Sequence, residues 1–209
     1  MEINSLSSSK PETRNSNKEF HNPELRTPNS ELRSTLRMVA WEVTRSCNLA
    51  CAHCRASAER GPYPGELDTA ACLRLIGEIV AAGTPVVILT GGEPLLRPDV
   101  FEIAAYGNRR GLRMVMATNG TLVTPETVTK MIASGIRRVS VSIDGPDAAS
   151  HDALRRVPGA FAGAIAGIET LKKGGMEFQV NTTVTRANLG RLAEIHALAV
   201  GLGAAAHHI

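Results

Sequence analysis

The sequence lacks several features that would place it in a familiar class of protein. It has no long basic run, and its 23 lysines and arginines nearly balance its 20 aspartates and glutamates, which leaves a net charge of +3. Composition therefore does not indicate a nucleic-acid partner. No apolar run reaches the roughly 18–20 residues needed to cross a bilayer, and the N-terminus is too polar for a secretory signal peptide. We expect neither a nucleic-acid-binding nor a membrane protein.

Cysteine is scarce as well. There are four cysteines, and three of them fall within "TRSCNLACAHCRA", residues 44–56. A secreted disulfide scaffold would spread its cysteines along the chain and use them in pairs. The clustering instead favours a reducing, cytoplasmic location in which the thiols bind a metal.

The chain divides into two parts of different composition. Residues 1–36 are rich in Ser, Asn, Pro, Glu and Arg and poor in apolar residues, so they cannot bury enough surface to offset their chain entropy. We predict a disordered N-terminal tail over residues 1–36 and a folded core domain over residues 37–209. Because the sequence stops inside the last expected strand, we expect this domain to be incomplete, with its C-terminal part missing.

Apolar, β-rich runs alternate with amphipathic helical patterns through the rest of the chain. This alternation is typical of an α/β fold in which helices join parallel strands, and runs such as "VVIL" and "MVMA" suggest strands buried on both faces. The expected strands are 38–44, 85–90, 112–118, 138–144, 178–184 and 205–209. The expected helices are 68–82, 124–134, 158–173 and 188–201. We predict a partial parallel (βα)6 barrel, truncated at the start of strand six.

Unusual polar segments follow the expected strands. The loop with three cysteines comes after the first strand. The later strands end in "TGGEP", "TNGT", "SIDGP" and "NTT", at residues 90–94, 118–121, 142–146 and 181–183. In parallel α/β folds the carboxyl ends of the strands share one rim, and sites form there. We therefore expect these segments to contribute to a single site.

The three clustered cysteines are spaced C-x3-C-x2-C, at Cys47, Cys51 and Cys54. A structural zinc site usually needs four ligands, yet Cys72 lies on the apolar face of a helix, where a small buried hydrophobe is the simpler interpretation. His53 is poorly placed to complete a tetrahedron. A disulfide would leave one cysteine over. An iron–sulfur cluster held by three thiolates would leave one iron open for a substrate or cofactor.

Together these segments resemble the radical SAM superfamily. The cysteine loop after the first strand and "GGEP" after the second carry the resemblance. It implies a [4Fe–4S] cluster on Cys47, Cys51 and Cys54, whose open iron binds the amino and carboxylate groups of S-adenosylmethionine (SAM). One electron from the reduced cluster would split SAM into methionine and a 5′-deoxyadenosyl radical. The resemblance also implies contacts with SAM from His53, Gly91, Gly92, Glu93, Pro94, Asn119, Ser142, Asp144 and Asn181.

Several of these residues also have plainer explanations. Gly91 and Gly92 suit a ligand site because backbone approaches a ligand closely only where no Cβ intervenes. Asn119 equally suits an Asn-Gly turn, and Asp144 suits a turn or helix entry in Asp-Gly-Pro. Ser142 and Asp144 alternate onto one strand face, which favours a shared ligand. Both interpretations stay open from the sequence.

Longer strings narrow the resemblance within the superfamily. "AWEVTRSCNLACAHCRA", "ILTGGEPLLRPD" and "SVSIDGPDAASHDALRRVPGAF" look like the heme b synthases, which decarboxylate two propionates of Fe-coproporphyrin III to vinyl groups. This resemblance implies a tetrapyrrole substrate and a low-potential electron donor such as ferredoxin or flavodoxin, with no general acid or base. Family members continue beyond this sequence, so we expect a fragment that holds the first cluster and SAM without necessarily turning over.

Other functions remain open. Didecarboxysiroheme deacetylases, and SPASM-type enzymes that mature peptides or cofactors, share part of the pattern. A non-enzymatic iron–sulfur sensor that reuses the barrel is the alternative from a different class. The "GGEP" segment and the polar pairs on the fourth and fifth strands argue against a sensor, because a sensor needs no SAM site.

A few basic residues are candidates for contact with the substrate. Arg155 and Arg156 would suit its carboxylates, as would His151, although an exposed basic helix start is the simpler interpretation. His207 would suit the porphyrin iron, or it is simply one of two strand histidines facing opposite ways. Arg45, beside the cysteine loop, either tunes the cluster or bonds a loop carbonyl.

Overall fold

The computed structural model describes residues 36–61 and 63–209, so the predicted tail lies almost wholly outside the described residues. In these residues six strands form one sheet with parallel neighbours. The strands are β1 (Met38–Thr44), β2 (Val86–Gly91), β3 (Arg113–Thr118), β4 (Val139–Ser142), β5 (Phe178–Asn181) and β6 (His207–His208). The helices are α1 (Thr69–Ala82), α2 (Val100–Arg109), α3 (Pro125–Ala133), α4 (Ala148–Arg155), α5 (Ala160–Lys173) and α6 (Leu192–Leu202). The predicted α/β fold is confirmed.

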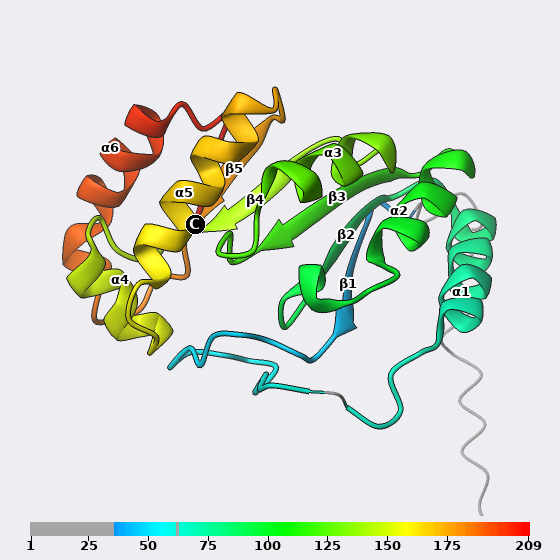
Figure 1. Ribbon diagram of the computed structural model, residues 1–209, viewed down its shortest axis with the longest axis horizontal. Coiled ribbons are helices and arrows are strands. Elements are labelled where there is room, and N and C mark those ends of the chain that lie inside the picture. Colours follow the sequence, from blue (N-terminus) through cyan, green and yellow to red (C-terminus); the bar gives the residue numbers. More distant parts are fainter. Residues whose placement is uncertain (1–35, 62) are drawn as a thin grey trace, which may run out of the picture. The chain divides into compact units, whose positions relative to one another are not determined.

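The sheet is a partial barrel. Its strand order follows the chain from β1 to β6, and the two outer strands do not pair with each other in the described residues. Figure 1 shows the helices connecting successive strands along this sheet. Because all strands run the same way, the loops that follow them gather at one rim, where the polar segments were expected.

Helix ends follow the predicted signals. Asp68 caps α1, because its side chain accepts a hydrogen bond from the backbone N–H of Ala71. Pro125 occupies the first turn of α3, and the preceding Thr124 forms a capping box with Thr127. These local interactions explain why the sequence alone places the two helices to within a residue at the start.

Two helices carry weaker sequence signals and were not predicted. α2 follows a short 3-10 turn, Pro94–Leu96, and α4 is a segment of eight residues with few large apolar side chains that starts after the capping side chain of Asp147. A third departure is the last helix, which starts as a 3-10 turn, Leu189–Arg191, before α6. None of the described helices is long and apolar enough to cross a bilayer.

The expected burial on both faces is found in β4 and β5 over their first three residues, but not in β2 and β3. On β3, Met114 and Met116 are fully buried, whereas Val115 and Ala117 are only half-buried. β2 shows the same alternation. The fully buried residues join the core with helix residues such as Ile76 and Ile103. The half-buried face includes Ala117, which lines a cavity at the rim, so the open inner face of the barrel is the face available to a ligand.

Candidate functional site

The cysteine loop leaves β1 and returns against its own backbone. The backbone N–H of Cys47 donates to the carbonyl of Glu59 at 2.8 Å, and all four cysteines of the chain are free thiols. Burial raises the pKa of the Cys47 thiol, so a thiolate at this position needs a compensating positive partner such as iron. Among the described residues, no three His, Cys, Asp or Glu side chains are grouped as they would be around a single metal ion.

The three clustered cysteines line one cavity of about 390 Å³ at the rim of the barrel. The cavity draws side chains or backbone from the ends of β2, β3 and β4, from α4, and from the segment after β5. The lining residues are Cys47, Leu49, Cys51, His53, Cys54, Arg55, Ala58, Thr90, Gly91, Gly92, Ala117, Thr118, Asn119, Ser142, Arg155 and Thr183. The predicted gathering of the polar segments at one site is therefore what the fold produces.

The two glycines of "GGEP" pack against the cysteine loop. A Cβ on Gly91 would lie 2.1 Å from the carbonyl oxygen of Thr44, and one on Gly92 would lie 2.2 Å from that of Ser46. The backbone N–H of Gly92 donates to Thr44, and that of Glu93 donates to Ser46, each at 2.7 Å. Both glycines also line the cavity. The chain itself therefore makes a close approach that requires glycine at both positions; contact of their backbone with a ligand stays a prediction.

Glu93 links the ends of β2 and β3. Its carboxylate is fully buried and accepts hydrogen bonds from the Thr118 hydroxyl at 2.8 Å, the Asn119 backbone at 2.8 Å and the Leu95 backbone at 3.1 Å. Burial raises the pKa of Glu93, and these donors oppose the rise. Pro94 is buried in the turn that follows and does not line the cavity.

Asn119 joins the cysteine loop to the loop after β3. Its side-chain amide donates to Asn48 at 2.8 Å, Asn48 donates to the Thr121 hydroxyl at 2.8 Å, and that hydroxyl donates back to Asn119 at 2.7 Å. This closed ring fixes the residue that follows Cys47. Asn119 thus has a structural role in addition to its place on the cavity wall.

A buried charged group borders the cavity: His53 and Arg155 line it, and their partner Asp144 does not. Asp144 is fully buried, and its Oδ2 lies 2.8 Å from Nη2 of Arg155 and 3.3 Å from Nε2 of His53. Burial lowers the pKa of His53, although Asp144 opposes this effect. The other ring nitrogen of His53, Nδ1, and Nε of Arg155 are buried without a hydrogen-bond partner. Buried polar atoms normally have partners, so these two suit a polar ligand beside the cysteines.

Comparisons with known proteins agree with this geometry. Residues 41–199 match the family described as the Radical SAM superfamily. The chain belongs to the radical SAM superfamily. This superfamily uses a [4Fe–4S] cluster and SAM, and the three free cysteines, the cavity and the unpartnered buried nitrogens fit both groups.

Relatives within the radical SAM superfamily include curated enzymes. An AdoMet-dependent heme synthase of Nitratidesulfovibrio vulgaris is 55% identical over 175 residues, which cover 84% of this chain and 48% of the relative. An AdoMet-dependent heme synthase of Methanosarcina barkeri is 52% identical over 173 residues, which cover 83% of this chain and 50% of the relative. A mycofactocin maturase of Mycobacterium ulcerans is 37% identical over 167 residues, which cover 79% of this chain and 45% of the relative. The chain spans about half the length of the curated relatives it matches.

Solved structures share the radical SAM fold at low sequence identity. Streptococcus suis SuiB bound to S-adenosylmethionine has a TM-score of 0.68 and 16% identity, covering 82% of this chain and 39% of that one. The anSMEcpe structure with bound AdoMet has a TM-score of 0.66 and 18% identity, covering 82% and 51%. At these identities the likeness concerns the fold alone.

The candidate substrate residues are placed differently from the sequence interpretation. Arg155 is not an exposed helix start. It is the last residue of α4, its side chain is 8% exposed, and it contacts Cys51 in the cysteine loop. Arg156 is exposed and ends the helix in a left-handed conformation. His151 is 1% exposed, and its Nδ1 accepts the backbone N–H of Asp144 at 3.1 Å. Burial, assisted by the charge of Arg155, lowers the pKa of His151 to about 4.

The other predicted residues divide between the cavity and its surroundings. Ser142 lines the cavity, whereas Asn181 does not and instead accepts a hydrogen bond from Gln179. His207 is half-buried on β6, with Nε2 2.8 Å from the Thr182 hydroxyl. Arg45 donates to the carbonyl of Ala56 at 3.4 Å, which is the plainer of its two predicted roles.

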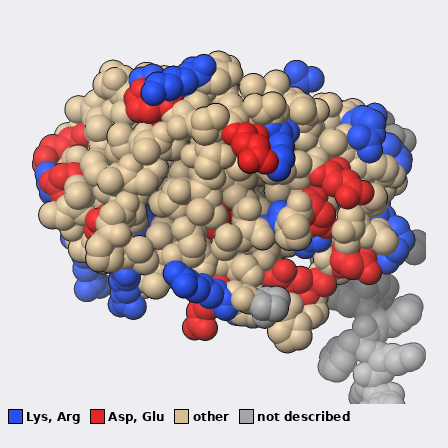
Figure 2. Space-filling model, in the orientation of Figure 1, with Lys and Arg blue, Asp and Glu red and all other residues tan. Residues whose placement is uncertain are grey.

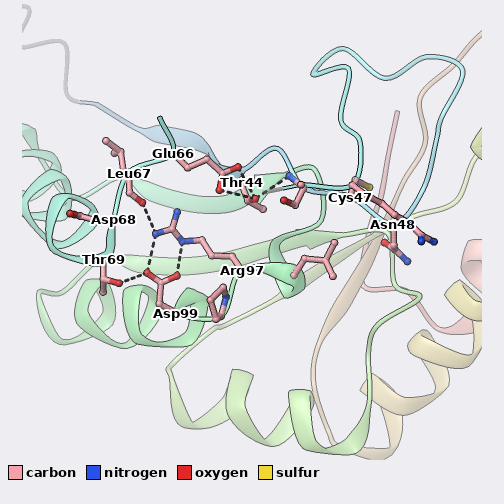
Figure 3. Close-up of a pocket in the computed structure, with 14 residues that line it drawn as sticks. Thr44, Cys47, Asn48, Glu66, Leu67, Asp68, Thr69, Arg97 and Asp99 are labelled. Carbon is pink, nitrogen blue, oxygen red and sulfur yellow. Dashed lines mark hydrogen bonds and ion pairs between the residues drawn. The ribbon is translucent and has the colours of Figure 1, made fainter. Parts of the chain in front are cut away.

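A second, larger cavity of about 730 Å³ also reaches Cys47 (Figure 3). Figure 3 shows Arg97 among the lining residues, donating to both carboxylate oxygens of Asp99 and to the carbonyl of Leu67. Burial alone would raise the pKa of Asp99, but hydrogen bonds from Arg97 and Thr69 outweigh it and lower the pKa. These contacts hold the segment that follows the cysteine loop. Arg97 and Asp99 belong to the string "ILTGGEPLLRPD", but their partners Leu67 and Thr69 lie about 30 residues earlier and are not apparent from the sequence.

Proposed function

We propose that this chain is the cluster- and SAM-binding part of a radical SAM enzyme that decarboxylates Fe-coproporphyrin III in heme biosynthesis. The supporting observation is its 52–55% identity to three AdoMet-dependent heme synthases across 83–84% of the chain. A protein named Fe-coproporphyrin III synthase and the mycofactocin maturases are more distant, at 37% identity or less.

In this proposal the three cysteines hold a [4Fe–4S] cluster, and SAM occupies the 390 Å³ cavity beside them. Cluster and SAM together supply radical chemistry when bound. The chain's own residues bind the cluster and SAM, orient SAM in the cavity and shield it from water. Ser142, His53 and the Gly91–Gly92 backbone line the cavity and are the proposed contacts. The buried Glu93 acts behind them by holding the end of β3 in place.

We further propose a cytoplasmic location and a low-potential electron donor such as ferredoxin or flavodoxin. Free cysteines that must ligate iron as thiolates are best preserved in a reducing compartment. We propose no nucleic-acid or membrane partner. On the face drawn in Figure 2, basic and acidic side chains are interspersed, and the net charge is +3.

The second candidate is a maturase of peptides or cofactors, because a mycofactocin maturase is 37% identical over most of the chain. An anaerobic assay separates the two. This chain, and one extended to the length of its relatives, would be reconstituted with iron and sulfide and mixed with reductant, SAM and Fe-coproporphyrin III. Mass spectrometry would follow 5′-deoxyadenosine and the porphyrin.

The assay has three informative outcomes for the extended chain. Deoxyadenosine together with porphyrins that have lost one and then two propionate carboxyl groups would support the heme synthase proposal. Deoxyadenosine with an unchanged porphyrin would refute that substrate and direct attention to the deacetylase and the maturases. If the extended chain formed no deoxyadenosine from SAM in this assay, the iron–sulfur sensor would be favoured.

A further inference from the structure

Each of the three cluster cysteines accepts one hydrogen bond at sulfur, but the donors differ. Cys47 accepts from the backbone N–H of Leu49 at 3.4 Å, and Cys54 accepts from the backbone N–H of Ala58 at 3.3 Å. Cys51 accepts from Nη1 of Arg155 at 3.5 Å. The donor to Cys51 is thus a charged side chain, whereas the other two donors are neutral amides of the loop itself.

The guanidinium of Arg155 is held in place from two sides. Nη2 pairs with the buried carboxylate of Asp144 at 2.8 Å, while Nη1 faces Cys51. The backbone of the same helix end accepts hydrogen bonds from the cysteine loop, from Ala52 to Leu154 at 2.8 Å and from Ala50 to Arg155 at 3.3 Å. The end of α4 and the cysteine loop therefore form one hydrogen-bonded assembly.

This arrangement orients an ion pair toward the sulfur. Asp144 and Arg155 neutralise each other, as burial demands, but the positive end of the pair points at Cys51. A guanidinium keeps its charge at every accessible pH. Reduction adds a negative charge to an iron–sulfur cluster, and hydrogen bonds to its sulfurs and nearby positive charge favour the reduced form. Partial burial strengthens this interaction, because little water screens it.

We propose that Arg155 is a positioning residue that raises the reduction potential of the cluster through its contact with the Cys51 sulfur. The proposal rests on the cluster of the superfamily and not on which substrate the enzyme takes. It also gives the arginine a role different from the substrate contact considered from the sequence. The adjacent Arg156 is exposed and offers a matched control that removes the same charge one residue away.

The test is a potentiometric titration of the anaerobically reconstituted chain, followed by the electron paramagnetic resonance signal of the reduced cluster, without substrate. Arg155→Gln removes the charge and keeps a side-chain amide donor. At the midpoint potential of the parent, we expect its ratio of reduced to oxidised cluster to fall about tenfold, equivalent to about 59 mV for one electron. Arg155→Lys keeps the charge without the planar fork and should shift less. Arg156→Gln should titrate like the parent.

Two results would overturn the proposal. One is an Arg155→Gln variant with full iron content and the midpoint of the parent. The other is an equal shift in Arg156→Gln, which would mean that net charge and not the contact is responsible. If Arg155→Gln fails to retain iron, the Arg155→Lys variant provides the test. A cluster midpoint potential below that of the parent supports the contact, and a midpoint potential equal to that of the parent refutes it. Because no substrate is present, failure here is distinguishable from a wrong assignment of the reaction.

Discussion

Replacing His151 with asparagine should flatten the response of the protein's stability to acid. In the folded chain His151 is 1% exposed and its Nδ1 accepts a hydrogen bond from the backbone of Asp144, so a proton on that nitrogen would remove the acceptor. Its pKa is lowered to about 4 from an ordinary value of 6.5, chiefly by burial. Asn Oδ1 can take the place of Nδ1 as the acceptor without titrating.

The magnitude follows from proton linkage. Between pH 6.5 and 4 the unfolded chain binds a proton at His151 that the folded chain does not, so acidification favours unfolding. Stability from this residue is therefore intact above pH 6.5 and is lost as the pH falls toward 4. Between pH 7 and pH 5 the loss is about 2 kcal/mol. The cavity left by the smaller side chain should cost about 1–3 kcal/mol at both pH values.

The assay is denaturant unfolding of the metal-free chain at pH 7 and pH 5 under reducing conditions. His151→Asn should lose about 2 kcal/mol less than the parent between the two pH values. Phe161→Leu is the matched control, because Phe161 packs edge-on against the ring of His151 at 5.7 Å and its loss leaves the titrating group in place. Equal losses in the parent and in His151→Asn would refute the reasoning.

Three further predictions concern the scaffold of the site. Gly92→Ala should lose most of its reconstituted iron, because its Cβ would lie 2.2 Å from the Ser46 carbonyl beside the cysteine loop; iron content comparable to the parent would contradict this. Cys72→Ala should retain the iron while losing about 1 kcal/mol of stability, measured by iron assay and urea unfolding. Thr118→Val should cost about 1–3 kcal/mol in urea unfolding, because buried Glu93 loses a donor; an unchanged midpoint would argue against that hydrogen bond.

Much of the fold could be predicted from the sequence because it depends on local patterns of apolar residues and helix caps. β1 was predicted at its observed bounds, and α1 and α3 were predicted through Asp68 and Pro125, whose effects act within one helical turn. α4 was missed because it is short and its only large apolar residue is Leu154, so it shows no apolar periodicity. Its stability comes from packing on α5 and on the cysteine loop, which is a tertiary contribution.

The site is likewise divided between features set by local sequence and features set by tertiary packing. C-x3-C-x2-C and "GGEP" carry their chemistry in residue type and spacing, so the sequence determined the superfamily and the cysteines expected to hold a cluster. It did not determine why Gly91 and Gly92 are glycines, because their close neighbours are Thr44, at the end of β1, and Arg45 and Ser46, which follow it. The contact between Arg155 and Cys51 spans 104 residues. Only the closing of the sheet toward a barrel brings α4 against the first loop, so the tertiary structure alone decided which arginine is buried beside sulfur and which is left in solvent.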